Sequence, residues 1–159
     1  MRCCIHSNLG SALSPQNAYY AILGLETMSI RTEKICNNAF ELAKSLQDKV
    51  YVDYPLLNLK YKDLCFRQFN GYGGGILTIR TGSKETAFKF IDSLKYADIL
   101  TNIGDARTLA VHSSSTIHNR LANKDKISAG VYDDLIRVSV GIEDINDLIV
   151  DFNNAIKDI

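Results

Sequence analysis

Apolar residues in the first third of the chain recur with helical spacing. Between positions 31 and 48 they step by four, three and four residues: Ile35, Ala39, Leu42 and Leu46. Charged residues lie among the remaining positions, which is the pattern of an amphipathic helix. Upstream, Ser14 offers a helix N-cap and Pro15 suits the first helical turn. We therefore predict a long N-terminal helix from residue 15 to about residue 48, continuous or bent at Gly24.

The rest of the chain alternates short extended segments with amphipathic helices. Runs of β-branched and other apolar residues predict five strands: residues 50–54, 76–80, 99–103, 108–111 and 135–140. Helices are predicted after Ser83 and over residues 143–157, where apolar residues share one face. Residues 56–70 fit neither period and stay open. The order of elements predicts an α+β fold, in which helices cover one face of a small, mostly antiparallel sheet.

Composition and charge narrow the class of protein. A chain of 159 residues with 46% hydrophobic content can form one ordinary core, so we expect a linker remnant over residues 1–14 and one domain over residues 15–159. Eighteen basic residues balance eighteen acidic ones, and this favours neither nucleic acid nor an anionic membrane as a partner. No apolar stretch reaches the ~20 residues that cross a bilayer, and no signal peptide or disulfide spacing is evident. These features predict a cytoplasmic protein.

The clearest alternating strand also carries a candidate binding residue. Successive side chains of a strand point to opposite faces, so Ile136 and Val138 leave one face and Arg137 leaves the other. A guanidinium fixed on a strand can bind a carboxylate through two parallel hydrogen bonds. A solvated surface arginine explains the same pattern, and the strand alone does not separate the two readings.

Other residues have suitable chemistry but lack the spacing of a known site. The glycine-rich residues 71–75 could hold a phosphate, but without a GxGxxG or P-loop pattern they better fit a tight turn into a strand. His112 and His118 lie in a Ser/Thr-rich segment without a metal or nucleophile motif, so we expect loop or supporting roles. A terminal group of possible metal ligands is equally undiagnostic: Cys3, Cys4 and His6. We predict no metal site.

The acidic residues of the last helix are predicted to be structural. Asp144, Asp147 and Asp151 fit a solvated helix face. Glu143 and Asp144 stand near the helix N-terminus, where the helix dipole favours negative charge. No pair of carboxylates is spaced as an acid/base dyad, so we assign no catalytic residue.

Several segments together resemble the C-terminal part of the Cys/Met metabolism (transsulfuration) family of pyridoxal-phosphate enzymes. They occur in the family's order: residues 10–15 (GSALSP), 24–28 (GLETM) with Arg31, 54–55 (YP), 71–75 (GYGGG), 102–109 (NIGDARTL) and 137–143 (RVSVGIE). The sequence of residues 102–109 is most similar to that of the corresponding segment in O-acetylhomoserine sulfhydrylases. The resemblance implies the small C-terminal domain of a fold-type I pyridoxal-phosphate enzyme.

The resemblance also implies a substrate site. By match, Arg137 grips the α-carboxylate of an amino-acid substrate similar to O-acetyl-L-homoserine, and Asn102 helps to hold the same group. In such enzymes pyridoxal phosphate acts as the electron sink while acetate is exchanged for sulfide or methanethiol. The substrate-binding residues we expect are therefore Arg137 and Asn102, and we expect no cofactor-binding residue in this chain.

The family's Schiff-base lysine belongs to a large domain that this chain lacks. The resemblance then implies a truncated or split enzyme that is inactive alone and needs the missing N-terminal half as a partner. A second hypothesis is a non-catalytic module that keeps the small-domain fold and assembles with full-length family members. An unrelated α+β ligand-binding domain is the third.

Overall fold

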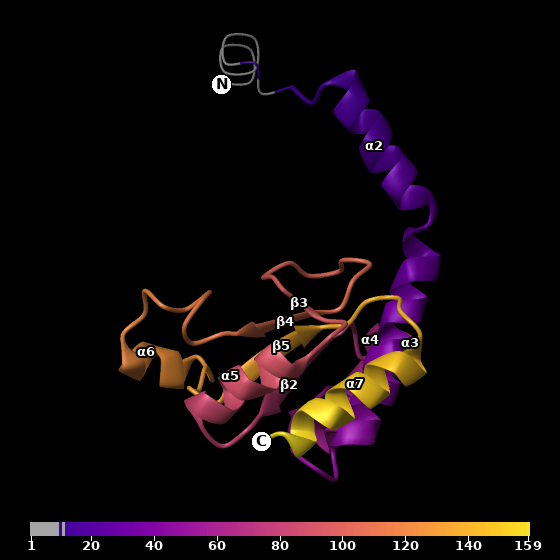
Figure 1. The fold of residues 1–159 in the computed structure, drawn as a ribbon. Helices are drawn as coiled ribbons and strands as arrows, with labels where there is room; N and C mark the ends of the chain where they lie inside the picture. Colours follow the sequence, from indigo (N-terminus) through magenta and orange to yellow (C-terminus); the bar gives the residue numbers. More distant parts are fainter. Residues whose placement is uncertain (1–9, 11) are drawn as a thin grey trace. The chain divides into compact units, whose positions relative to one another are not determined.

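The computed structural model describes Gly10 and residues 12–159 of the chain, and Figure 1 shows how the helices and strands are arranged. The chain forms two compact units, Met1–Arg31 and Thr32–Ile159. In the first unit, helix α2 (Pro15–Glu26) begins as predicted, because the Ser14 side chain accepts a hydrogen bond from the backbone N–H of Asn17.

The long helix predicted for the N-terminal segment is interrupted, but not at Gly24. Helix α2 ends at Glu26, Thr27 leaves the helical conformation, and helix α3 (Met28–Leu46) begins directly after it. Gly24 stays inside α2, and its carbonyl accepts a hydrogen bond from Nη2 of Arg31 at 3.0 Å. Because Arg31 supplies this donor, the carbonyl stays satisfied where the helix is broken. The prediction of a bend at Gly24 was therefore wrong by three residues.

The second unit is built on a five-stranded sheet with the order β1-β2-β5-β4-β3. The strands are β1 (Tyr51–Asp53), β2 (Ile76–Arg80), β3 (Asp98–Ile99), β4 (Leu109–His112) and β5 (Leu135–Ser139). Every neighbouring pair is antiparallel except β3 and β4, which are parallel. The prediction of a mostly antiparallel sheet is confirmed, although β3 is only two residues long.

The core lies between this sheet and three helices, α3, α5 (Lys84–Ser93) and α7 (Ile145–Lys157) (Figure 1). Phe90 of α5 and Phe152 of α7 meet edge to face with ring centroids 5.8 Å apart, and both are fully buried. The apolar positions predicted for α3 are all buried: Ile35, Ala39, Leu42 and Leu46. Helices therefore cover one face of the sheet, as the α+β prediction requires.

Two helices were not predicted. Helix α4 (Leu59–Gln68) occupies the segment that was left open, and helix α6 (Asn123–Ser128) lies between β4 and β5. Helix α4 buries only Cys65 and starts at Asn58, whose side chain accepts from the N–H of Lys60. Helix α6 has six residues, none of them buried. Neither helix has the apolar period that reveals a helix in a sequence. Within the described part of the chain, every helix is too short or too polar to cross a lipid bilayer.

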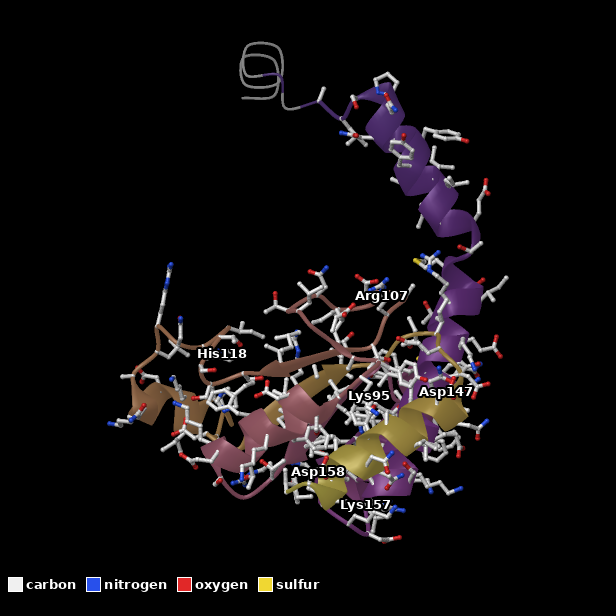
Figure 2. The ribbon with its side chains drawn as sticks, viewed as in Figure 1. Lys95, Arg107, His118, Asp147, Lys157 and Asp158 are labelled. Atoms are coloured by element: carbon white, nitrogen blue, oxygen red, sulfur yellow. The ribbon has the colours of Figure 1, made fainter. Side chains whose placement is uncertain are left out.

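Asp151 corrects the prediction that the aspartates of the last helix form a solvated face. Asp144 caps α7 and Asp147 is exposed, as expected, but Asp151 is buried. Its carboxylate accepts hydrogen bonds from the backbone N–H groups of Lys95, at 3.1 and 3.0 Å, and of Tyr96, at 3.0 Å. Lys95 and Asp147 are labelled in Figure 2. The segment after α5 needs an acceptor there, and Asp151 supplies it.

We expect Asp151→Ala to lower the free energy of unfolding by about 2 kcal/mol, because two backbone donors lose their charged acceptor. Urea denaturation monitored by circular dichroism measures this change. Asp147→Ala is the matched control on the same helix, and its effect should stay within about 0.5 kcal/mol. Equal effects of the two variants would show that the Asp151 hydrogen bonds contribute no net stability.

Candidate functional site

Strand β5 places Arg137 on the face of the sheet opposite the helical core. Its neighbours Ile136 and Val138 are fully buried in the core, as the alternation predicted. Strand β5 lies between β2 and β4, where Arg137 is paired with Thr78 on one side and Val111 on the other. Antiparallel pairing on both sides holds the backbone that carries the guanidinium.

The Arg137 guanidinium is half-buried beneath the loop that follows β3. Its Nη2 donates a hydrogen bond to the carbonyl oxygen of Thr101 at 2.6 Å and another to that of Asn102 at 3.4 Å. Its Nε is buried and has no hydrogen-bond partner among the described residues. Burial also lowers the pKa of the Arg137 guanidinium. A buried N–H without an acceptor costs about 1–3 kcal/mol, and an anion placed against it would remove this cost.

Asn102 meets Arg137 through its backbone. The residue is exposed, and the hydrogen bond that joins it to Arg137 uses its carbonyl oxygen. The structure therefore brings the two predicted substrate-binding residues together on neighbouring elements, β5 and the loop between β3 and β4. Arg107, on the same loop, forms an exposed ion pair with Asp98 at 2.8 Å, and its side chain is labelled in Figure 2.

The residues that follow Arg137 fasten this loop to the sheet. The Ser139 hydroxyl accepts a hydrogen bond from the N–H of Gly104 at 3.3 Å. The Glu143 carboxylate accepts two bonds from Thr108, one from its N–H at 2.5 Å and one from its hydroxyl at 2.9 Å. The Thr108 hydroxyl in turn accepts from the N–H of Gly141 at 2.9 Å. The segment of residues 137–143 thus provides a guanidinium and also the attachment points of the loop above it.

Two positions near this loop are restricted in which residue they can hold, one by lack of space and one by its hydrogen bonds. Gly141 lies so close to the loop that an added Cβ would meet the Ala106 carbonyl oxygen, and would lie 2.5 Å from the Arg107 carbonyl carbon. Asn38 of α3, which is buried, donates from Nδ2 to the carbonyl oxygens of Gly141 at 3.0 Å and Glu143 at 2.9 Å. Sequence reasoning missed Asn38, because its partners lie more than 100 residues away along the chain.

The two histidines take supporting roles, as expected. His112 is buried at the end of β4, where its Nε2 lies 2.7 Å from the carbonyl oxygen of Asp133 and its Nδ1 lies 2.7 Å from the Ser115 hydroxyl. A carbonyl only accepts, so Nε2 carries the proton and Nδ1 accepts from Ser115. His118 lies on the turn that follows β4 (Figure 2). Among the described residues, no group of three His, Cys, Asp or Glu side chains could hold a metal ion.

The remaining candidates are structural or lie outside the described residues. The 71–75 segment leads into β2 and packs so closely that a Cβ on Gly73 would lie 2.7 Å from the Tyr54 hydroxyl. That hydroxyl donates to the Gly74 carbonyl oxygen at 2.8 Å, which fits the tight turn that we expected. Cys36 and Cys65 are free thiols that line an apolar groove of about 470 Å³ between α3 and α4. The terminal metal-ligand candidates lie outside the described residues: Cys3, Cys4 and His6.

Comparison with known proteins identifies the family to which the chain belongs. Residues 2–157 match the family model of the Cys/Met metabolism PLP-dependent enzymes, and the chain belongs to that family. It is 40% identical to the O-acetyl-L-homoserine sulfhydrylase of Leptospira meyeri over 158 residues, which are 96% of this chain and 36% of the relative. It is 39% identical to the homocysteine synthase of Schizosaccharomyces pombe, over 94% of this chain and 36% of that enzyme.

Solved structures give the same result for the fold. A putative O-acetylhomoserine (thiol)-lyase of Campylobacter jejuni superposes with a TM-score of 0.87 at 32% identity, over 95% of this chain and 37% of that chain. Yeast cystathionine gamma-lyase superposes with a TM-score of 0.88 at 30% identity, over 94% of this chain and 40% of that chain. The chain thus spans little more than a third of the length of the relatives that it matches, and the predicted resemblance to the C-terminal part of the family is confirmed.

The family depends on pyridoxal phosphate, and the Campylobacter structure carries this group on a lysine. That covalent lysine is not part of the present chain, as the resemblance implied. In the described part of the chain, the buried side-chain donor left without a partner is Arg137 Nε. A lone guanidinium N–H suits a carboxylate and cannot replace a lysine that bonds to the cofactor aldehyde. The donor that the described residues leave unpaired therefore suits an anionic group and does not fit the covalent attachment of the cofactor.

Proposed function

We propose that this chain is the substrate-carboxylate-binding part of an O-acetylhomoserine sulfhydrylase-like enzyme of methionine and cysteine metabolism. The observation that carries the proposal is the Nε of Arg137, which is buried and has no partner among the described residues. The same guanidinium is already held through Nη2, which donates to the Thr101 carbonyl oxygen. The α-carboxylate of an amino acid such as O-acetyl-L-homoserine supplies the missing acceptor. Asn102, on the adjoining loop, contributes to the same site. We place the protein in the cytoplasm, in a truncated or split form that is inactive alone.

In this arrangement the chain orients the substrate. Arg137 holds the carboxylate through charge-assisted hydrogen bonds, and the loop fastened by Ser139 and Glu143 keeps the guanidinium in place. Fixing one end of a small amino acid restricts where its reactive carbons lie. Pyridoxal phosphate, when bound by the lysine-bearing part of the family fold, supplies the electron-accepting ring.

Binding of the carboxylate can be tested on the isolated chain, without turnover. We expect O-acetyl-L-homoserine to shift the NMR resonance of the Arg137 Nε–H, with a dissociation constant on the order of millimolar for a single unassisted contact. The methyl ester of the same compound should bind at least ~10-fold more weakly, because it has no anionic oxygens.

Two variants make this test specific for the guanidinium. Arg137→Lys should weaken binding by about 10-fold, because an ammonium lacks the planar pair of donors. Arg120→Lys makes the same exchange at an exposed arginine and should leave binding unchanged. The proposal fails if the ester binds as well as the free acid, or if Arg137→Lys has no effect.

A second candidate function is a non-catalytic module that assembles with full-length family members. Helix α2, which has no buried residue and several exposed apolar side chains, favours it, since such a helix suits association. Mixing the chain with a lysine-bearing polypeptide separates the two functions. Restored turnover supports the split enzyme, whereas association without turnover supports the module.

A further inference from the structure

Helix α2 exposes apolar side chains along its whole length. None of its residues is buried, and Glu26 is its only charged residue. Five large apolar side chains are between 48% and 61% exposed: Tyr19, Tyr20, Ile22, Leu23 and Leu25. A surface helix of a complete globular protein has a polar face, and α2 has none.

The large apolar residues of α2 lie on more than one side of the helix. Successive helical residues are separated by about 100°, so Tyr20 and Leu23, three residues apart, share one side of the helix, and Ile22 lies on another. Contact with a flat surface would cover one of these two sides and leave the other in water. The arrangement calls for a concave apolar surface that encloses the helix on several sides.

The comparisons indicate which protein can provide this surface. The match with the Campylobacter structure covers 95% of this chain but only 37% of the Campylobacter chain. The Leptospira sulfhydrylase likewise continues beyond the 36% of its length that this chain matches. Most of the family fold, including the part that holds the lysine, is therefore available in the relatives to pack against the equivalent of α2.

We propose that α2 is the docking helix that recruits the lysine-bearing part of the family fold as a separate polypeptide. This inference rests on the proposed function for the identity of the partner. The partner binds α2 in an apolar groove that accepts Tyr20, Ile22 and Leu23. Docking assembles the two parts of the active site from two chains.

The test uses the full chain and, as its partner, the portion of the Leptospira meyeri sulfhydrylase that this chain does not match, produced as a separate polypeptide. We expect a complex by size-exclusion chromatography and calorimetry. The double variant Ile22→Lys, Leu23→Lys should weaken it by at least ~30-fold, because charges are placed where apolar side chains are desolvated. Val150→Lys is the matched control, since Val150 is 60% exposed on α7 and Ile22 is 59% exposed on α2.

A covalent version covers the case in which the separate partner does not fold. The same portion of the relative is joined to the full chain as one polypeptide. The double lysine variant should then lower the unfolding temperature of the fusion, while the same substitutions in the chain alone should change it by no more than about 2 °C. The inference is wrong if neither format gives a stable assembly, or if the assembly tolerates the lysines.

Further outcomes separate this inference from its alternatives. Arg137→Lys should weaken carboxylate binding and leave the complex intact. Normal docking by an unsubstituted chain that binds the ester as well as the free acid would overturn the proposed function and not the role of α2. Sedimentation of the chain alone tests a second copy as the occupant. A dimer that the double lysine variant dissociates would assign α2 to self-association and overturn the proposal.

Discussion

Replacing Gly141 by alanine is expected to lower the free energy of unfolding by about 3 kcal/mol, which corresponds to a fall of roughly 6–12 °C in the unfolding temperature of a domain of this size. A Cβ at this position would meet the Ala106 carbonyl oxygen and would lie 2.5 Å from both the Arg107 carbonyl carbon and the Glu143 carboxylate. Two of these three neighbours are backbone atoms, which cannot rotate away. Differential scanning calorimetry measures the change.

Gly24→Ala is the control for this substitution. Gly24 lies inside helix α2, and apart from its chain neighbours and the backbone of its own helix nothing lies within 4 Å of the position of its added Cβ. Alanine there should be neutral or should stabilise the helix by up to about 1 kcal/mol. Equal tolerance of Gly141→Ala and Gly24→Ala would contradict the close approach of Gly141 to the Ala106 and Arg107 backbone.

Strand β5 shows how much of the site the sequence could predict. Its alternation correctly separated Ile136 and Val138, which are buried in the core, from Arg137, which lies on the other face. Alternation is a local property, and it survives in any sheet that buries one face. The roles of Ser139 and Glu143 are different, because their partners Gly104 and Thr108 lie 35 residues away along the chain. Spacing within one segment cannot reveal such contacts.

The difference between local patterns and long-range contacts also explains where the prediction of the fold was wrong. Asp151 was expected in solvent because it lies outside the apolar stripe of its helix, yet backbone donors of the segment after α5 come within 3.1 Å of its carboxylate. Helices α4 and α6 have almost no buried residues, so their sequences do not need the periodic apolar residues from which a helix is predicted. Elements that fill the core were therefore predictable, whereas elements held by polar or long-range contacts were not.

The site is also more than the arginine that the strand pattern singled out. Thr101 and Asn102 belong to a loop whose position depends on Thr108, and Thr108 is held by Glu143 and Gly141. A carboxylate ligand of Arg137 would therefore bind to a guanidinium that is oriented by contacts outside the binding surface. Substitution of a residue that holds the loop without touching the ligand should therefore change both the free energy of unfolding and the affinity for the carboxylate.

Glu143→Ala is expected to lower the free energy of unfolding by about 3 kcal/mol, because both the N–H and the hydroxyl of the buried Thr108 lose a charged acceptor. Glu143→Gln keeps a side-chain oxygen and should lose about half as much. Glu33→Ala removes an exposed glutamate from α3 and should change stability by less than about 0.5 kcal/mol.

A double-mutant cycle with Thr108→Val shows whether Glu143 acts through Thr108. We expect the Glu143→Ala, Thr108→Val pair to be less destabilising than the sum of the single variants by about 1–2 kcal/mol, since each removes the same hydroxyl hydrogen bond. Glu143→Ala should also weaken binding of O-acetyl-L-homoserine by roughly 3–10-fold, a change below about 1.4 kcal/mol, through release of the loop over Arg137. Additive effects in the cycle together with unchanged affinity would show that Glu143 stabilises its own helix N-terminus and has no part in holding the carboxylate site.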